Sequence, residues 1–266
     1  MEWPPSAASR SSGWPVSPFH SSTFRLLGVE PSTSDAAVRD IEDAGRRVGL
    51  RLPESLREWY SNEGAIEILA RYSNQDWPIS PRDFAVTEWQ GDKLLPFKNE
   101  NQGVCVWAVV LDGSDDPPVY VDVDSHGTQW NEQAPTFSAY IYSCVWDYTQ
   151  VIDQPASVRA QNGPLSSEAG SMLRDLFAEQ PPTFGWPGSS QRRFQGKNCA
   201  ILIWSGEDQA DWFIGARDAP SMEEALSLVW NLDAVGHFLY GCSEFGEAAL
   251  ENVRRGRQPG RDCGQT

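Results

Sequence analysis

Carboxylates and one tyrosine gather in a short stretch of the chain, between positions 115 and 124. The stretch begins in a turn rich in Gly, Asp and Pro. It continues as a strand in which apolar and polar residues alternate, so Val119, Val121 and Val123 are expected to face the core. The other side of the strand would expose Tyr120, Asp122 and Asp124. Together with Asp115 and Asp116 of the turn, these are the candidate partner-binding residues. An aromatic residue flanked by carboxylates suits the anchor of a protein–protein interface.

Other chemistry for these groups has less support. Asp122 and Asp124 could bind a hard cation or act as an acid/base pair, but no third ligand stands at a useful spacing. The histidines His20, His126 and His237 also lack a second ligand at helical or hairpin spacing. We therefore expect no metal, no cofactor and no catalytic residue, and we interpret the two aspartates as an acidic edge that faces solvent or a partner.

The charge of the chain narrows the class of partner. There are 37 acidic against 21 basic side chains, for a formal net charge of -16. Such a surface repels nucleic acids and anionic membranes, and it attracts basic proteins over about a Debye length. No stretch approaches the roughly 20 apolar residues of a membrane span. Five widely spaced cysteines favour a reducing compartment, so a cytoplasmic protein with a protein partner is expected.

The first part of the chain is predicted to contain a flexible lead and two helices. Residues 1–22 are rich in Pro and Ser and are expected to form a flexible lead. A helix should then begin at Ser34, a good N-cap, and stop at about Gly49. A second helix should begin at Pro53 and end at Gly64, which would make a helical hairpin.

Strands and one further helix follow. The apolar run 104–111 predicts a strand buried on both faces, and 118–124 predicts the alternating strand described above. Residues 136–151 predict an aromatic-rich helix that packs over the sheet. The string Asn101-Gln102-Gly103 could present amides to a partner, but a turn that needs a glycine backbone explains it better.

The last third of the chain has weaker signals. Residues 153–170 are polar and contain two prolines and two glycines, which predicts a linker. Residues 171–256 alternate between helical and strand patterns, as either a second small α/β unit or an extension of the first sheet. The tail 257–266 is expected to be flexible. The string Gly185-Trp186-Pro187-Gly188 could be a binding loop or a tryptophan tucked under a connection.

Two strings together resemble a known family. They are LPESLREWYSNEGA, which holds Trp59 and Gly64, and FKNENQGVCVWAVVLDGSDDPPVYVDVD. The second string holds Glu100, Asn101, Gln102, Gly103, Pro117 and Pro118. With the later Trp130 and FSAYIY, they make residues 33–151 resemble the SMI1/KNR4 family, also called the SUKH superfamily. Where that family usually has a glycine pair, this chain has Glu63-Gly64, so one loop should differ.

The resemblance implies an α+β domain at 23–152, with a mixed, mainly antiparallel sheet flanked by helices and no enzymatic activity. Bacterial members are immunity proteins that bind and neutralise a toxin, often a nuclease, and fungal members are tied to the regulation of cell-wall synthesis. An acidic protein can occupy the basic phosphate channel of a nuclease. The first hypothesis is therefore an immunity protein with a basic toxin domain as partner. The alternatives are a regulatory or scaffold protein and a hydrolase with its site in the C-terminal part.

Overall fold

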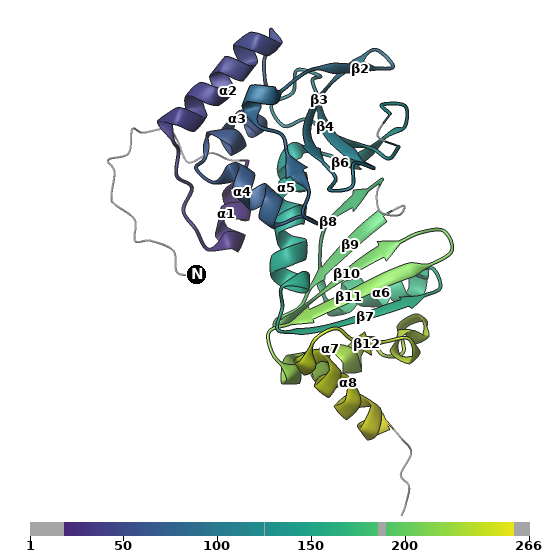
Figure 1. Ribbon diagram of the computed structural model, residues 1–266. Helices are drawn as coiled ribbons and strands as arrows, with labels where there is room; N and C mark the ends of the chain where they lie inside the picture. Colours follow the sequence, from purple (N-terminus) through teal and green to yellow (C-terminus); the bar gives the residue numbers. More distant parts are fainter. Residues whose placement is uncertain (1–18, 125, 186–189, 258–266) are drawn as a thin grey trace, which may run out of the picture.

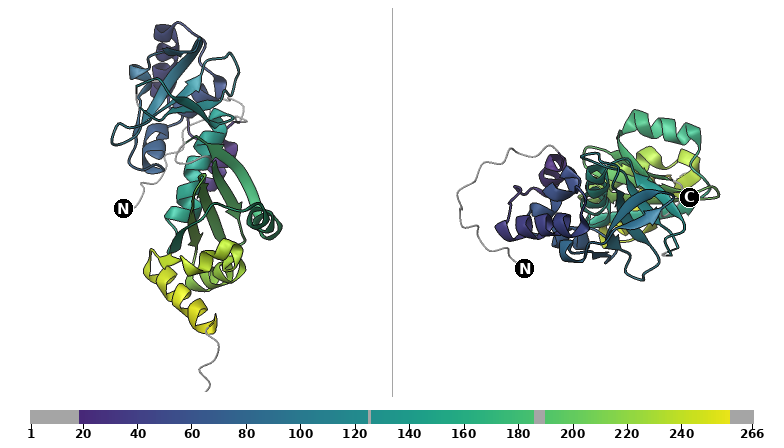
Figure 2. Two further views of the ribbon diagram at one scale, coloured as in Figure 1. Left: turned by 90° about the vertical axis from the view of Figure 1, so that its right-hand side faces the viewer. Right: turned by 90° about the horizontal axis from the view of Figure 1, so that it is seen from above.

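The computed structural model describes residues 19–124, 126–185 and 190–257. It shows two units, each with its own sheet and its own buried core, arranged one beyond the other (Figure 1). The side view in Figure 2 shows that the molecule is elongated along this direction. Helices and antiparallel sheets are both present, so the α+β class predicted from the sequence is confirmed, and every pairing between the described strands is antiparallel.

The first unit consists of a helical layer, a six-stranded sheet and a long final helix. Its elements are α1 (Ser21–Leu27), α2 (Asp35–Val48), α3 (Glu54–Ser61), α4 (Ala65–Arg71), β1 (Trp77–Pro78), the 3-10 helix η1 (Pro81–Asp83), β2 (Thr87–Trp89), β3 (Asp92–Asn99), β4 (Val106–Val110), β5 (Val119–Asp122), β6 (Trp130–Ala134) and α5 (Phe137–Trp146). The strand order is β1-β3-β4-β5-β6, and β2 pairs with β3. The helices α1 to α4 lie on one side of this sheet (Figure 1).

The predicted helical hairpin is present, with one difference at its end. The Ser34 side chain accepts a hydrogen bond from the Ala37 amide at the start of α2, and Gly49 ends α2 in the left-handed conformation. The next helix begins after Pro53 as predicted, but it ends at Asn62. Gly64, at a φ of 77°, starts α4 and does not close α3. The prediction was wrong here because a left-handed glycine can precede a helix as well as follow one.

The predicted lead is too long, because its last residues belong to the fold. His20 is fully buried, 5.0 Å from the Trp59 ring and 5.8 Å from the Phe137 ring. Its Nε2 lies 2.9 Å from the Ser55 carbonyl oxygen, and its backbone N–H donates to Glu58. The pocket combines α3 with α5, which are far apart in the sequence, so local composition could not reveal it. Residues 1–18 lie outside the described residues.

Burial lowers the pKa of His20 from 6.5 to about 4, despite the opposing bond to Ser55 and the nearby Asp116. The folded state therefore takes up this proton later than the unfolded state. Stability linked to His20 is present at neutral pH and is lost as the pH falls from about 6.5 to about 4. Between pH 7 and pH 4.5, the wild type should lose about 2–3 kcal/mol more unfolding free energy than His20→Gln. Urea titrations at the two pH values check this, and equal losses in both proteins would contradict it.

The second unit follows α5 directly, and its first strand lies inside the segment predicted as a linker. Its elements are the π-helical η2 (Asp147–Ile152), β7 (Ala156–Asn162), α6 (Ser167–Leu176), β8 (Ala178–Phe184), β9 (Ser190–Gln195), β10 (Cys199–Ser205), β11 (Ala210–Ala216), α7 (Ala219–Val229), the 3-10 helix η3 (Leu232–His237), β12 (Tyr240–Gly241) and α8 (Glu244–Arg257). The order β12-β7-β11-β10-β9-β8 places β7 inside the sheet. The linker prediction for 153–170 is therefore wrong, as is the start of the second unit at residue 171.

The second unit has its own sheet and its own core, so it is a separate unit and not an extension of the first sheet. Side chains from β7, β10 and β11 pack with α6, α7 and α8 in one buried cluster. Arg257 is the last residue of α8, so the predicted flexible tail does not begin there, and the rest of that tail lies outside the described residues. Of the predicted loop at 185–188, only Gly185 is described; it lies against Val121 and the Glu132 carbonyl of the first unit.

Helix α8 crosses β7 at a glycine. A Cβ on Gly246 would lie 2.0 Å from the Ser157 carbonyl oxygen, which is a backbone atom that cannot rotate away. We expect Gly246→Ala to lower the unfolding free energy by about 1–3 kcal/mol or more. Gly256→Ala, in the same helix, is the matched control, because nothing lies within 4 Å of its Cβ position. It should be neutral or raise stability by up to about 1 kcal/mol. Thermal unfolding of both variants checks the pair, and a neutral Gly246→Ala would contradict the close approach.

Helix α5 belongs to both units. Phe137, Tyr140 and Ile141 pack in the core of the first unit. One turn further on, Trp146 packs against Leu202 of the second sheet. Figure 1 shows this helix running from the first sheet to the second. The predicted helix at 136–151 is thus present, with its last turn π-helical, and it connects the two cores.

Candidate functional site

The predicted acidic patch does not form as a free surface. Asp115 is exposed, but its carboxylate lies 2.6 Å from the Arg51 guanidinium. Asp116 accepts hydrogen bonds from the Ser138 amide at 3.0 Å and the Ser138 hydroxyl at 2.5 Å, in the first turn of α5. These two carboxylates therefore bind groups of their own chain. Asp116 has the role of a helix-terminus acceptor.

Asp122, the last residue of β5, lies next to Asp124 in the turn that leads to β6. Asp122 is only 1% exposed and accepts the Gly127 amide at 2.7 Å. Burial raises the pKa of Asp122, whereas a hydrogen bond from the Thr128 hydroxyl leads the interactions that lower the pKa of Asp124 to about 2. The prediction that Asp122 faces solvent was wrong. Strand alternation predicted on which side of the sheet Asp122 lies, but it could not predict the loop that folds back over its carboxylate.

Tyr120 is the predicted site residue that stays available. It lies on the side of the first sheet opposite the helices, half-buried against Trp89, with ring centroids 5.9 Å apart. Leu94, Ala108 and Trp130 are buried beside them. We call this surface the aromatic face and define it by the side chains of Trp89, Leu94, Val106, Ala108, Val110, Tyr120 and Trp130. Figure 1 shows no helix on this side of the sheet.

The aromatic face carries acidic groups and no basic ones in its strands. Asp92 pairs with Trp89 across a two-residue turn whose residues, Gln90 and Gly91, both have positive φ. Glu132 pairs with Tyr120 across β5 and β6. Both carboxylates are exposed. Burial is the main cause that raises the pKa of Tyr120, and the negative charges of Glu132 and Asp92 raise it further. By strand register, the remaining positions on this face are Trp77, Thr87, Leu94, Pro96, Asn99, Val106, Ala108, Val110, Asp122 and Trp130, without lysine or arginine.

Sequence reasoning missed most of this face. Trp89 and Asp92 come from one hairpin and Glu132 from a strand much later in the chain, and only the sheet register brings them beside Tyr120. The available signal was the spacing of Asp92 and Leu94 after a Gln-Gly turn, which matches the alternation of a hairpin strand.

The family-motif residues have structural roles. Trp59 is fully buried. The Glu100 carboxylate accepts the Gln102 amide at 2.6 Å and the Val104 amide at 3.4 Å, and Asn101 donates to the Asn74 carbonyl. Gly103 has a φ of 74°, which confirms the interpretation as a turn with a glycine backbone. Pro117 is buried and Pro118 half-buried, just before β5.

A buried ion pair lies under the first sheet. The Lys98 ammonium is 2.5 Å from the Asp76 carboxylate, and both side chains are at most 5% exposed. The same ammonium lies 3.8 Å from the Trp107 ring centroid and 5.3 Å from that of Tyr140. A bulge in β3 between Pro96 and Lys98 turns the lysine inward. All partners of this lysine are enclosed in the protein, so the pair connects β3 to the segment after α4.

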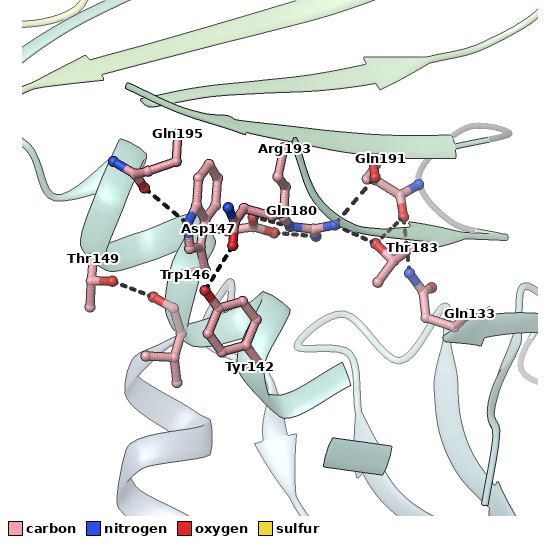
Figure 3. Close-up of polar contacts among 11 residues, drawn as sticks. Gln133, Tyr142, Trp146, Asp147, Thr149, Gln180, Thr183, Gln191, Arg193 and Gln195 are labelled. Atoms are coloured by element: carbon pink, nitrogen blue, oxygen red, sulfur yellow. Dashed lines mark hydrogen bonds and ion pairs between the residues drawn. The ribbon is translucent and has the colours of Figure 1, made fainter. Parts of the chain in front are cut away.

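A second polar cluster joins the two units (Figure 3). Arg193 of β9 binds Asp147 with two hydrogen bonds, of 2.6 and 2.7 Å, and it also donates to Thr183. Burial raises the pKa of Asp147, and the Arg193 charge acts against this shift. The same junction contains the pairs Gln133–Gln191, Tyr142–Gln180 and Trp146–Gln195, each at 3.1 Å. These groups bind one another, so the cluster fixes α5 and β6 against the second sheet.

The described ranges offer few other candidate sites. No group of three or more His, Cys, Asp or Glu residues in the described ranges could hold a metal ion. No described helix is long and apolar enough to cross a membrane. An open groove of about 530 Å³ lies between α7 and α8, where Glu223 accepts a hydrogen bond from Asn252. The groove lining, which also includes Glu224 and Ser227, contains no histidine or cysteine.

Comparison with known proteins gives no match: no family model, no curated protein and no solved structure is similar to this chain. The SMI1/KNR4-like assignment therefore rests on the sequence motifs alone, which are the two strings with Trp130 and FSAYIY. It stays a prediction, together with the function that it implies.

Proposed function

We propose that this protein is a non-catalytic protein-binding module that uses the aromatic face of its first unit. The observation that supports this proposal best is the position of Trp89 and Tyr120, between the exposed carboxylates Asp92 and Glu132. Both rings are partly exposed on a side of the sheet that none of the described helices covers. Aromatic residues at the centre of a patch with a polar rim are the usual anchors of protein interfaces.

We further propose that the partner is a basic toxin domain and that this chain neutralises it in the cytoplasm. The net charge of -16 would steer such a partner onto the surface. The four described cysteines, Cys105, Cys144, Cys199 and Cys242, are free thiols, which agrees with a reducing compartment. The resemblance of residues 33–151 to the SMI1/KNR4 family points to the same role.

The test is a titration of the purified protein with the toxin domain encoded beside it. We expect saturable binding that weakens as salt increases, together with loss of the toxin activity. Absence of binding would contradict the immunity role. Saturable binding to an intracellular protein that is not a toxin would instead favour a regulatory or scaffold role.

The surface itself is tested by two variants. Trp89→Ala/Tyr120→Ala should weaken partner binding by about 30-fold or more, as expected for paired anchor residues. Glu132→Arg should also weaken it, and because residue 132 is exposed, this change leaves the core intact. Phe245→Ala is the matched control, since this aromatic residue is 54% exposed on the second unit. Equal affinities for all variants would place the binding surface elsewhere.

A further inference from the structure

The aromatic face and its two carboxylates have the composition of a site for arginine. Trp89 and Tyr120 form a T-shaped pair with 74° between the ring planes, so the two rings do not stack face to face. Asp92 and Glu132 pair in register with these same two residues. A guanidinium can stack on an aromatic ring while its N–H groups bind a neighbouring carboxylate, because its donors lie in the plane of the fork.

The chain already places its own cations over aromatic rings at other positions. Lys98 lies over Trp107, Arg159 lies 4.8 Å from the Phe213 centroid, and Arg257 lies 5.1 Å from that of Trp230. Among the described residues, no cation lies over the rings of Trp89 or Tyr120.

The flanking carboxylates are free in the same way. Within the described ranges, neither Asp92 nor Glu132 takes part in a salt bridge, whereas Asp115 and Asp76 do. The face thus combines open aromatic rings, unpaired carboxylates and strands without a basic side chain. Among the described residues, these side chains have no cationic partner.

We infer that the aromatic face binds an arginine side chain on a basic segment of the partner, between Trp89, Tyr120 and the carboxylates Asp92 and Glu132. This inference rests on the proposed function and names the chemistry of the partner. Arginine is favoured over lysine because an ammonium is a compact, strongly hydrated charge, which cannot stack on a ring and bind a carboxylate through two parallel donors.

The experiment compares two short Gly/Ser peptides, one arginine-rich and one with every arginine replaced by lysine, in calorimetric titrations with the full chain. The arginine peptide should bind about two- to five-fold more tightly than the lysine peptide. Tyr120→Leu, which keeps an apolar side chain, should remove this preference. Glu132→Gln should weaken the arginine peptide by about two- to five-fold. Glu207→Gln, an exposed acidic residue of the second unit, should leave the affinity unchanged.

Three results would overturn the inference. They are absence of saturable binding, equal affinity for both peptides, and equal effects of Glu132→Gln and Glu207→Gln. The last two would mean that the peptide follows net charge alone. These failures are separate from failure of the proposed function. In one such case, the protein binds both peptides equally while Trp89→Ala/Tyr120→Ala still weakens binding of the toxin domain. That result would support the binding surface and contradict only the arginine assignment.

Discussion

Lys98→Met is expected to lower the free energy of unfolding by about 3–5 kcal/mol, as found when one partner of a buried ion pair is removed. The substitution leaves Asp76 enclosed at 5% exposure without its cation. It also removes the cation from the Trp107 ring. Urea unfolding followed by tryptophan fluorescence measures the loss.

Two further variants show whether the lost pair causes this effect. Lys93→Met, on the same strand but exposed, should change stability by less than about 0.5 kcal/mol. The double variant Lys98→Met/Asp76→Asn removes both charges and should recover part of the loss. If Lys93→Met and Lys98→Met have the same effect, or if the double variant is less stable than Lys98→Met, the ion pair is not what stabilises the contact between β3 and the segment after α4.

Arg193→Met is expected to lower the unfolding free energy by a similar amount, about 3–5 kcal/mol, at neutral pH. The Arg193 side chain is 3% exposed and forms two bonds with Asp147, so its removal leaves a carboxylate buried between the units. Without the arginine, the pKa of Asp147 rises further, because burial acts alone. A raised carboxyl pKa penalises the folded state at high pH, so part of the lost stability should return as the pH falls. Urea titrations at pH 7 and pH 5 measure both effects.

The neighbouring arginine provides the matched control for this junction. Arg192 pairs with Glu179 at the surface, with side chains 19% and 28% exposed, and Arg192→Met should cost about 1 kcal/mol or less. The double variant Arg193→Met/Asp147→Leu should be more stable than Arg193→Met alone. A loss in Arg193→Met that does not depend on pH would contradict an uncompensated Asp147 carboxylate as its cause.

Local signals predicted the elements whose ends are determined by their own residues. Ser34 and Gly49 bound α2 because a hydroxyl cap and a left-handed glycine act within a few residues. The apolar run before Asp112 and the alternation after Pro118 predicted β4 and β5 in the same way. Strand β7 was missed because Pro155, Gly163 and Pro164 surround it with turn signals, and Ala156 and Ala160 on its buried face have weak hydropathy.

The candidate site depended on information that no local pattern contains. Tyr120 was predicted to be a binding residue from its strand alternation, and the structure leaves it partly exposed. Its proposed neighbours Asp116 and Asp122 instead bind backbone groups of α5 and of the turn after β5. The carboxylates that lie beside Tyr120 are Asp92 and Glu132, which come from the adjacent hairpin and the next strand.

The sequence by itself therefore determined the helical hairpin, the strands around the acidic turn and the excess of negative charge, because each follows from composition or from short-range periodicity. The α+β class was predicted from the resemblance of two sequence strings to a known family. Only the tertiary structure decided which carboxylates stay free, where His20 lies and how α5 connects the two cores. Those outcomes depend on sheet register and on contacts between distant elements, and the free energy of a carboxylate differs greatly between solvent, a backbone amide and a buried arginine.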